Sequence, residues 1–235
     1  MSEILKLVKM DLIIIKNKSV LPFVFFMSVY MFLGYIISPY AVISPVLFAG
    51  FMIQPLFSID EQNDMSRLYG SLPVSRRNRA IARFMSAGLI TAIALVISMI
   101  AAFHSVEVGW FKELNPELYE SYCIMQLEGI TIGIVACFIY AVVCFILGIQ
   151  YTLLYLFGAS KEAFTMIATF LIILGFIIAD GLFFDGKTMD IFSNVLSRLM
   201  IKSEMLFYIV LYGASVGFLL ICALISSLIM KKREI

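Results

Sequence analysis

The residue pattern closest to a catalytic motif is Gly213-Ala214-Ser215-Val216-Gly217, which matches G-x-S-x-G. In hydrolases this pattern places a nucleophilic serine on a sharp turn between a strand and a helix. Here the pentapeptide lies inside an uncharged stretch of helical length, and the only histidine, His104, belongs to a different stretch. Two glycines four residues apart instead let a second helix approach closely. The helix-packing residues predicted on this basis are Gly129, Gly133, Gly213 and Gly217.

The remaining nucleophilic and metal-binding residues are scattered along the chain. Cys123, Cys137, Cys144 and Cys222 include no CxxC pair and have no neighbouring histidine, so neither a zinc site nor a disulfide framework is indicated. Cysteines of this kind mostly serve as small buried hydrophobic residues. A single histidine also excludes the H-E-x-x-H motif, which needs two on one helix face. We predict no catalytic residue and no metal ligand.

Asp180 and Glu128 are the acidic residues closest to the long apolar stretches. A carboxylate within lipid is a candidate functional residue, because burying its charge there is costly. Both acids, however, fall at the predicted ends of membrane helices, where water is near. We expect solvated helix ends at both positions, with contact to a substrate or ion as the alternative.

The sequence lacks the motif for binding ATP. It contains no G-x-x-x-x-G-K-[ST] loop, and no stretch between the apolar segments is long enough to fold into a nucleotide-binding domain. If ATP drives this protein, ATP and Mg²⁺ must therefore bind to a separate subunit. We expect this chain to bind no cofactor itself.

The composition is that of a membrane protein. Hydrophobic residues make up 62% of the 235 residues and charged residues only 14%, whereas soluble domains carry about a quarter charged residues. About 20 helical residues cross the hydrocarbon core of a bilayer. The sequence therefore predicts an all-α polytopic protein whose surroundings are lipid, and the net charge of +1 indicates no nucleic-acid partner. Uncharged stretches cover residues 19–59, 84–103, 129–160, 163–179 and 205–230.

Residues 19–59 are too many for one membrane helix at ordinary tilt. Ser38-Pro39-Tyr40 near the middle supplies a break, because proline lacks a backbone donor and restricts the residue before it. We therefore expect two helices joined by a tight turn. The six predicted transmembrane helices cover residues 19–37, 41–59, 81–104, 129–156, 163–182 and 205–230.

Basic residues predict which side of the membrane each loop occupies, because cytoplasmic loops are enriched in Lys and Arg. Four lysines precede the first predicted helix and five arginines follow the second, so an even number of crossings separates these clusters. Residues 104–128 carry five glutamates against Lys112 alone and are expected outside. The turn at residues 158–162 and the basic residues 231–233 are expected in the cytoplasm, as are both termini. Residues 180–204 fit this pattern least, since they carry three basic residues outside.

Residues 1–18 form a separate amphipathic segment. On a helical projection, lysines lie opposite an apolar arc, which is typical of a helix in the membrane interface. The alternative is a charged extension of the first membrane helix. The arc consists of Ile4, Leu5, Val8, Leu12 and Ile15, and the opposite face of Lys6, Lys9 and Lys16.

Residues 60–80 are the longest expected cytoplasmic stretch between membrane helices. Residues 60–69 predict a short helix with acids in its first turn, where they favour the helix dipole, before Gly70 and Pro73 end it. Ser75 is placed to cap the next helix, which begins with four arginines within eight residues. A solvated basic loop explains the arginines, but it does not explain an acidic helix followed by a Leu-Pro turn.

This acidic stretch, followed by Gly70-Ser71-Leu72-Pro73-Val74-Ser75-Arg76 and placed after two membrane helices and a basic amphipathic N-terminus, resembles the small bacterial ABC-2-type permeases. These include the exporters of phenol-soluble modulins and of bacitracin-like antibiotics. The resemblance covers the topology of the whole chain. It implies a six-span permease of the bacterial cell membrane that pairs with an ABC ATPase and with a second permease, identical or paralogous.

The resemblance also implies roles for particular segments. The helix between the second and third spans couples to a cleft of the ATPase, and the turn at residues 158–162 is a second, smaller contact. Short re-entrant helices precede the last span, and residues 183–203 fit them because their amphipathic part is too short and polar to cross. The implied coupling residues are Asp60, Glu61, Asp64, Met65, Arg67, Leu68 and Tyr69.

These features favour ATP-driven export of an apolar or amphipathic cargo, either a peptide or a lipid-like molecule, by alternating access. The alternative is an energy-independent secondary carrier or a membrane scaffold subunit. A carrier ordinarily places ionisable residues at mid-membrane. None lies in the middle of any predicted span, and no inverted repeat relates residues 1–104 to residues 105–235.

Overall fold

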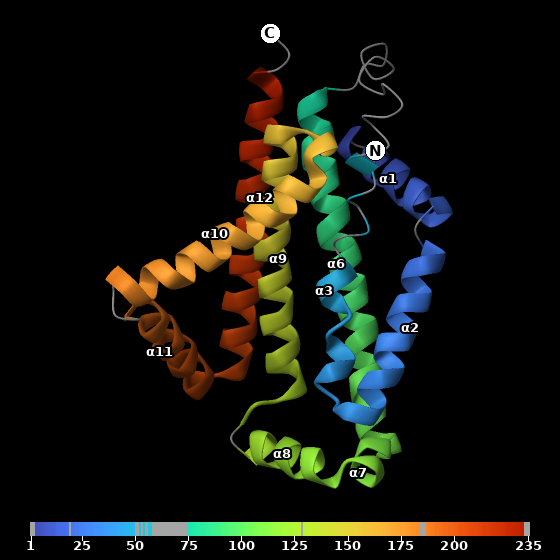
Figure 1. Cartoon of the computed structure of the whole chain (residues 1–235), viewed down its shortest axis with the longest axis vertical. Coiled ribbons are helices and arrows are strands. Elements are labelled where there is room, and N and C mark those ends of the chain that lie inside the picture. The colour runs from blue at the N-terminus through green and yellow to red at the C-terminus, as the bar shows by residue number, and fades with distance from the viewer. Residues whose placement is uncertain are drawn as a thin grey trace.

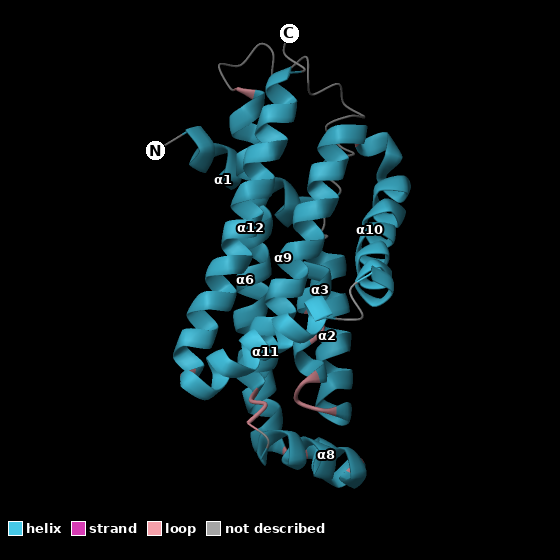
Figure 2. Cartoon of the chain, turned by 90° about the vertical axis from the view of Figure 1, so that its left-hand side faces the viewer, coloured by secondary structure: helices cyan, strands magenta, loops and turns pink. Residues whose placement is uncertain are grey.

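The computed structural model describes residues 3–18, 20–49, 52, 54, 56–57, 75–127, 129–183 and 187–232. Within these ranges the chain is helical with short turns and contains no strand, as predicted (Figures 1 and 2). In chain order the elements are α1 (Glu3–Lys18), α2 (Val20–Ile37), η1 (Ala41–Ile43), α3 (Val46–Ala49), α6 (Arg76–Val108), α7 (Trp110–Leu114), α8 (Pro116–Leu127), α9 (Ile132–Phe157), η3 (Ala159–Lys161), α10 (Glu162–Phe183), α11 (Lys187–Lys202) and α12 (Glu204–Lys232).

Three of the described helices, α6, α9 and α12, are long and apolar enough to cross a membrane. They pack side by side at the centre of the molecule (Figure 1). Close approach depends on small residues such as Ala136, which is fully buried, and Gly148. A Cβ on Gly148 would lie 2.5 Å from Cε1 of Phe218 on α12. Parts of α2 and α10 are apolar but shorter, so the count of six spans stays a prediction.

The predicted break near residue 39 is confirmed. α2 ends at Ile37, and the Ser38 N–H donates to the Gly34 carbonyl at 2.9 Å, which closes the last turn of the helix. The chain then turns back very close to α2, since a Cβ on Gly34 would lie only 2.7 Å from the backbone nitrogen of Val42. Glycine is therefore required at position 34 for this hairpin.

After the turn, the chain runs along α9. The Tyr40 hydroxyl donates to the Ile130 carbonyl, just before α9 begins, at 2.6 Å. Gln54 accepts a hydrogen bond from Gln150, near the other end of α9, at 3.1 Å. From Ile132, the first residue of α9, to Gln150 the helix rises about 27 Å, which is close to the thickness of the hydrocarbon core. Whether this segment forms a second span stays a prediction.

Two short helices, α7 and α8, lie across one end of the bundle, called here the α8 end (Figure 1). α6 stops at Gly109, whose φ of +71° is the left-handed conformation that ends helices. The Asn115 side chain donates to the Ile36 carbonyl at 2.8 Å and thereby holds α7 and α8 against the end of α2. The stretch expected as an external loop is thus largely helical. The opposite end, where α1 lies and α6 begins, is called the α1 end.

α10 leaves the centre of the molecule obliquely, and α11 turns back towards α12 (Figure 1). Leu196 and Leu199 of α11 pack against a small core that includes Phe207 and Leu211 of α12. The expectation of a solvated Asp180 is wrong, because α11 returns beside α10 and this side chain is only 4% exposed. Glu128 lies outside the described residues. Whether α11 is re-entrant stays a prediction.

Large apolar side chains face outward along the long helices. Ile100 on α6 and Phe170 on α10 are each 65% exposed, and many neighbours on the same faces are exposed as well. Apolar surface on this scale is unfavourable in water and is solvated by lipid. The exposed faces of α6, α10 and α12 therefore indicate a membrane environment.

Candidate functional site at the α1 end

The α1 end contains a cluster of buried polar and aromatic side chains, called here the junction. Its members come from α1, residues 54–57, α6, α9 and the first turn of α10, which are far apart in the sequence. Buried polar side chains among apolar helices are costly unless they are paired, so their concentration at one end of the bundle marks a candidate functional site. The junction consists of Asp11, Gln54, Phe57, Arg83, Phe84, Ser86, Gln150, Tyr151, Tyr155 and Glu162.

A chain of side-chain hydrogen bonds forms the polar part of the junction. Gln150 Nε2 donates to Gln54 Oε1 at 3.1 Å, and Gln54 Nε2 donates to Glu162 Oε1 at 2.5 Å. Gln54 and Gln150 are only 4% and 1% exposed, so each amide depends on the other for its hydrogen bonds. These contacts hold the chain before residue 58 against both α9 and the start of α10.

Phe57 is the centre of the aromatic part. The Arg83 guanidinium carbon lies 4.6 Å from the centroid of the Phe57 ring, and the Tyr151 and Tyr155 rings lie 5.3 and 5.1 Å from it. A desolvated cation over an aromatic face contributes about 2 kcal/mol. Arg83, which falls within the predicted third membrane helix, is only 3% exposed. Phe57 is thereby attached to both α6 and α9.

Ser75 begins the described chain again after residues 58–74. Its Oγ accepts a hydrogen bond from the Asn78 N–H at 3.2 Å, which confirms the predicted cap of α6. The Asn78 side chain in turn donates to Glu3 Oε2 at 2.6 Å and joins α6 to α1. Phe57 and Ser75 are therefore both attached to the first turns of α6. The two described residues that flank positions 58–74 in the sequence are thus held by the same helix.

α1 packs on α6 through the apolar side of its amphipathic pattern. Leu7, Val8 and Ile15 are buried, whereas Leu5, expected on the apolar arc, is 47% exposed because the buried face is centred one position further along the helix. Asp11 lies in the middle of this face, only 3% exposed, and the Ser86 hydroxyl donates to its Oδ2 at 3.5 Å. Placement of α1 in a membrane interface stays a prediction.

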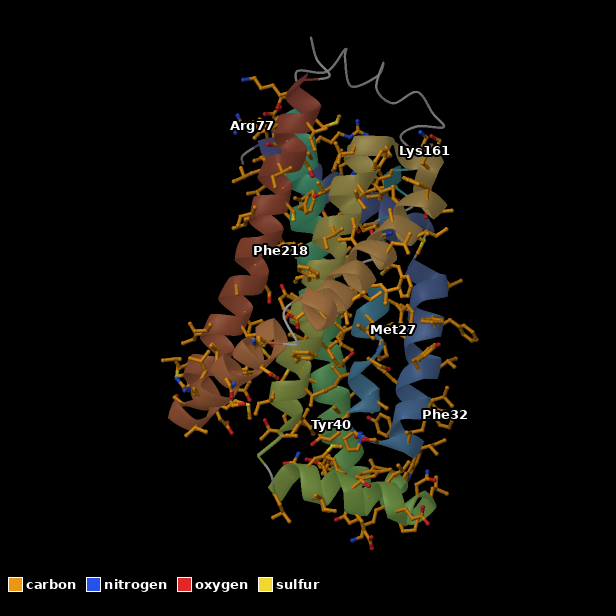
Figure 3. All side chains as sticks on the ribbon, turned by 60° about the vertical axis from the view of Figure 1, so that its left-hand side comes forward. Met27, Phe32, Tyr40, Arg77, Lys161 and Phe218 are labelled. Carbon is orange, nitrogen blue, oxygen red and sulfur yellow. The ribbon has the colours of Figure 1, made fainter. Side chains whose placement is uncertain are left out.

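The seven predicted coupling residues lie outside the described residues. In the sequence, however, they lie between two parts of the junction: Phe57 precedes them and α6 follows them. The predicted second contact is described: α9 ends at Gly158, with φ +90°, and α10 begins at Glu162. Figure 3 shows Arg77 and Lys161 at this same end of the molecule, with Tyr40 towards the opposite end.

The four predicted packing glycines have three different surroundings. A Cβ on Gly133 would lie 2.6 Å from the Tyr208 hydroxyl of α12, so this glycine permits a close contact between helices. Gly129 has φ +83° and occupies the turn before α9, with open space around it. Gly213 and Gly217 meet nothing within 4 Å, so their face of α12 is uncovered in the single chain. Packing at that face stays a prediction.

Several junction residues were not singled out from the sequence. Gln150 carries a readable signal, because it is a polar residue inside the apolar stretch 129–160. Asp11 lies three and four residues from Val8 and Ile15, so a helical projection places it on the apolar arc. Gln54 carries a similar signal within residues 19–59. Nothing in the sequence indicates that Gln54 and Gln150 meet.

The residues tested for chemistry lie in ordinary helical settings. α12 is continuous through residue 215, and the Ser215 hydroxyl donates to the Leu211 carbonyl at 2.6 Å, so no sharp turn presents this serine. Cys137, Cys144 and Cys222 are buried free thiols and Cys123 is half-buried. Among the described residues, no group of three His, Cys, Asp or Glu side chains is arranged to hold a metal ion.

The arrangement is suited to transmitting motion. Phe57 contacts α6 and α9, Ser75 caps α6, and both helices extend through the apolar bundle. A displacement at the α1 end would therefore move packed helices rather than a loose loop. The fold and junction define a multi-pass helical membrane protein with a mechanical connection at one end.

Comparison with protein families is consistent with this class. The family model described as ABC-2 family transporter protein matches residues 6–232, which is nearly the whole chain. The protein therefore belongs to the ABC-2 transporter family and is a membrane permease of an ABC transporter. Members of this family are membrane subunits that generally work beside an ABC ATPase and do not catalyse a reaction themselves. Comparisons with curated proteins and with solved structures gave no significant match.

Proposed function

We propose that this chain is the membrane-spanning permease subunit of an ATP-driven exporter, which moves an apolar or amphipathic cargo by alternating access. A separate ABC ATPase binds ATP and Mg²⁺, and a second permease, identical or paralogous, completes the pathway. The chain crosses a bacterial cell membrane six times. The permease contributes no catalytic residue; it converts movement of the ATPase into movement of its helices.

The observation that carries this proposal is the attachment to the bundle of Phe57 and Ser75, the described residues that flank positions 58–74 in the sequence. Phe57 contacts Arg83 of α6 and Tyr151 of α9, while Gln54 is hydrogen bonded to Gln150 and Glu162. A force applied to residues 58–74 or to the turn before α10 reaches the same three helices. Two contacts with an ATPase would thus act on one rigid unit.

The distribution of charge supports a cytoplasmic location for the α1 end. Arg77 and Lys161 lie there, together with the exposed lysines of α1 (Figure 3). The α8 end instead carries exposed acids, among them Glu113, Glu117 and Glu120. Cytoplasmic loops of membrane proteins are enriched in Lys and Arg. Residues 58–74 consequently lie on the side where an ATPase has access to ATP.

The test is replacement of Asp60, Glu61 and Asp64 together by Ala, with the permease co-expressed with the ATPase encoded beside it. We expect loss of ATPase co-purification and of cargo export, with the amount of permease in the membrane unchanged. A matched control replaces Glu113, Glu117 and Glu120 by Ala at the α8 end and should retain both activities. Unchanged ATPase binding and export in the first variant would refute the coupling role of these acids.

A further inference from the structure

A cavity of about 780 Å³ opens at the α8 end, away from the junction. It lies between α6, α8, the start of α9 and the start of α12. Its volume is that of a site for a small organic molecule and is far larger than a single ion requires. The residues that matter for its chemistry are Glu107, Tyr122, Gln126, Thr131, Glu204 and Tyr208.

The cavity carries negative charge without a compensating base. Glu107 comes from the last turn of α6 and Glu204 is the first residue of α12, so two helix ends each contribute a carboxylate. None of the described residues that line the cavity is Lys, Arg or His. The nearby Lys112 lies over the Tyr119 ring, 5.2 Å from its centroid, and is not part of the lining. A cleft lined by one sign of charge attracts ligands of the opposite sign.

The neutral groups of the cavity are already fixed in position. The Gln126 amide donates to the Tyr122 hydroxyl at 3.3 Å, and the Thr131 and Tyr208 hydroxyls are 3.3 Å apart. Burial raises the pKa of Tyr122, so this hydroxyl stays neutral at physiological pH. The faces of tyrosine rings attract organic cations, most strongly where water is excluded. Gly133 contributes to the shape, because a Cβ there would displace the Tyr208 hydroxyl.

We infer that this cavity binds a cationic amphiphile. The cationic group lies between Glu107 and Glu204, and the apolar part lies against Phe103 and the tyrosine rings. Apolar surface predominates in the lining, which favours an organic cation over a hydrated metal ion. If the protein exports as proposed above, the site binds positively charged amphipathic cargo at the external end of the transport pathway. Only this role depends on the proposed function; the binding itself does not.

The experiment uses the purified full-length permease in discs of zwitterionic lipid, without ATPase. Tetraphenylphosphonium is the cationic probe, and tetraphenylborate, which has nearly the same shape, is the charge-inverted control. We expect saturable binding of the phosphonium and only lipid partitioning of the borate. Protein-free discs give the background. Saturable binding of both ions with similar affinity would overturn the inference.

Paired variants locate the site. Replacing Glu107→Gln together with Glu204→Gln is expected to weaken phosphonium binding about tenfold, because both charges near the ligand are removed. The matched control, Glu117→Gln with Glu120→Gln, removes the same charge from exposed positions of α8 that do not line the cavity, and should leave the affinity unchanged. Thermal unfolding of each variant verifies its fold. Equal affinity in the two double variants would refute this site and leave the ATPase pairing untouched.

Discussion

Gln150 and Ser98 show how differently two buried polar side chains in the same bundle are used. The Gln150 amide is almost completely buried and donates to Gln54. The Ser98 hydroxyl is completely buried on α6 and has no hydrogen-bond partner among the residues that the structure describes. A buried group whose partner is removed incurs a desolvation cost, whereas a group that never had a partner can be removed freely.

Substitutions of Gln150 and of Ser98 are therefore expected to have different effects on stability. Gln150→Leu should lower the free energy of unfolding by about 1 kcal/mol, because it leaves Gln54 without its donor. It should also weaken the response of export to ATP, because the link from α9 to residues 54–57 is broken. Ser98→Ala should leave stability unchanged or raise it. Unfolding in mixed micelles and ATP-dependent export are the measurements; equal costs for both variants would contradict this account.

At the level of single residues, the sequence could not predict which side chains contact each other. Gln54 and Gln150 are separated by 96 residues, and Gln54 and Glu162 by 108. Polarity within an apolar stretch marks each residue as unusual, but pairing depends on the relative positions of three helices. The same reason explains why the contact between Arg83 and Phe57 could not be predicted: the location of Phe57 is defined only by the fold.

Among the elements, the hairpin of α2 and the following segment depends most on one position. Gly34 faces the backbone of Val42 so closely that a methyl group would contact its nitrogen and Cα at 2.7 and 2.8 Å. Backbone atoms cannot rotate away as a flexible side chain can. The hairpin would have to open, and the path of residues 40–57 along α9 would shift with it.

We accordingly expect Gly34→Ala to destabilise the protein by about 1–3 kcal/mol, the usual cost of overpacking. Gly175→Ala is the matched control, because Gly175 lies inside α10 with open space around its Cα. There alanine should stabilise the helix by up to about 1 kcal/mol. The stabilities are compared by measuring the unfolding midpoints of the two variants in the same detergent. A neutral Gly34→Ala would show that the hairpin is looser than described.

Element boundaries followed well from local chemistry. Proline at position 39, serine at position 75 and glycine at position 158 each mark an observed boundary, because turns and caps depend on adjacent residues. The external loop was less well predicted. Residues 110–127 form two helices, although their charges alone suggested a solvated connection. The Asn115 side chain donates to Ile36 of α2, and the Gln126 side chain donates to the Tyr40 hydroxyl; these bonds supply the support that the charge pattern does not show.

At the scale of the whole molecule, one face of α12 is notable for having no neighbour. Gly213 and Gly217 open onto empty space, and exposed apolar residues such as Val210 and Leu220 surround them. Lipid can cover this surface, and so can a second permease, because small residues allow backbones to approach. The proposed pairing of two permeases is testable at these two glycines.

Replacing Gly213 and Gly217 together by Leu should leave the single chain folded, since no described residue lies within 4 Å of a Cβ at either position. It should prevent association if the second permease packs there. Gly175→Leu together with Gly181→Leu is the control, because it adds the same bulk at two open positions of α10. Mass photometry in detergent measures the populations of single and paired chains. Pairing that persists in the double variant would exclude this face of α12.

The attachment of Phe57 and Ser75 to one folded bundle has a consequence for how such transporters diversify. The contacts that hold these two residues, Phe57 with Arg83 and Ser75 with Asn78, lie outside residues 58–74. The folded bundle thus fixes the two residues between which that segment runs in the sequence. The recognition sequence for an ATPase can therefore change without disturbing the helices that handle cargo. Related permeases could therefore pair with different ATPases while keeping the same membrane helices.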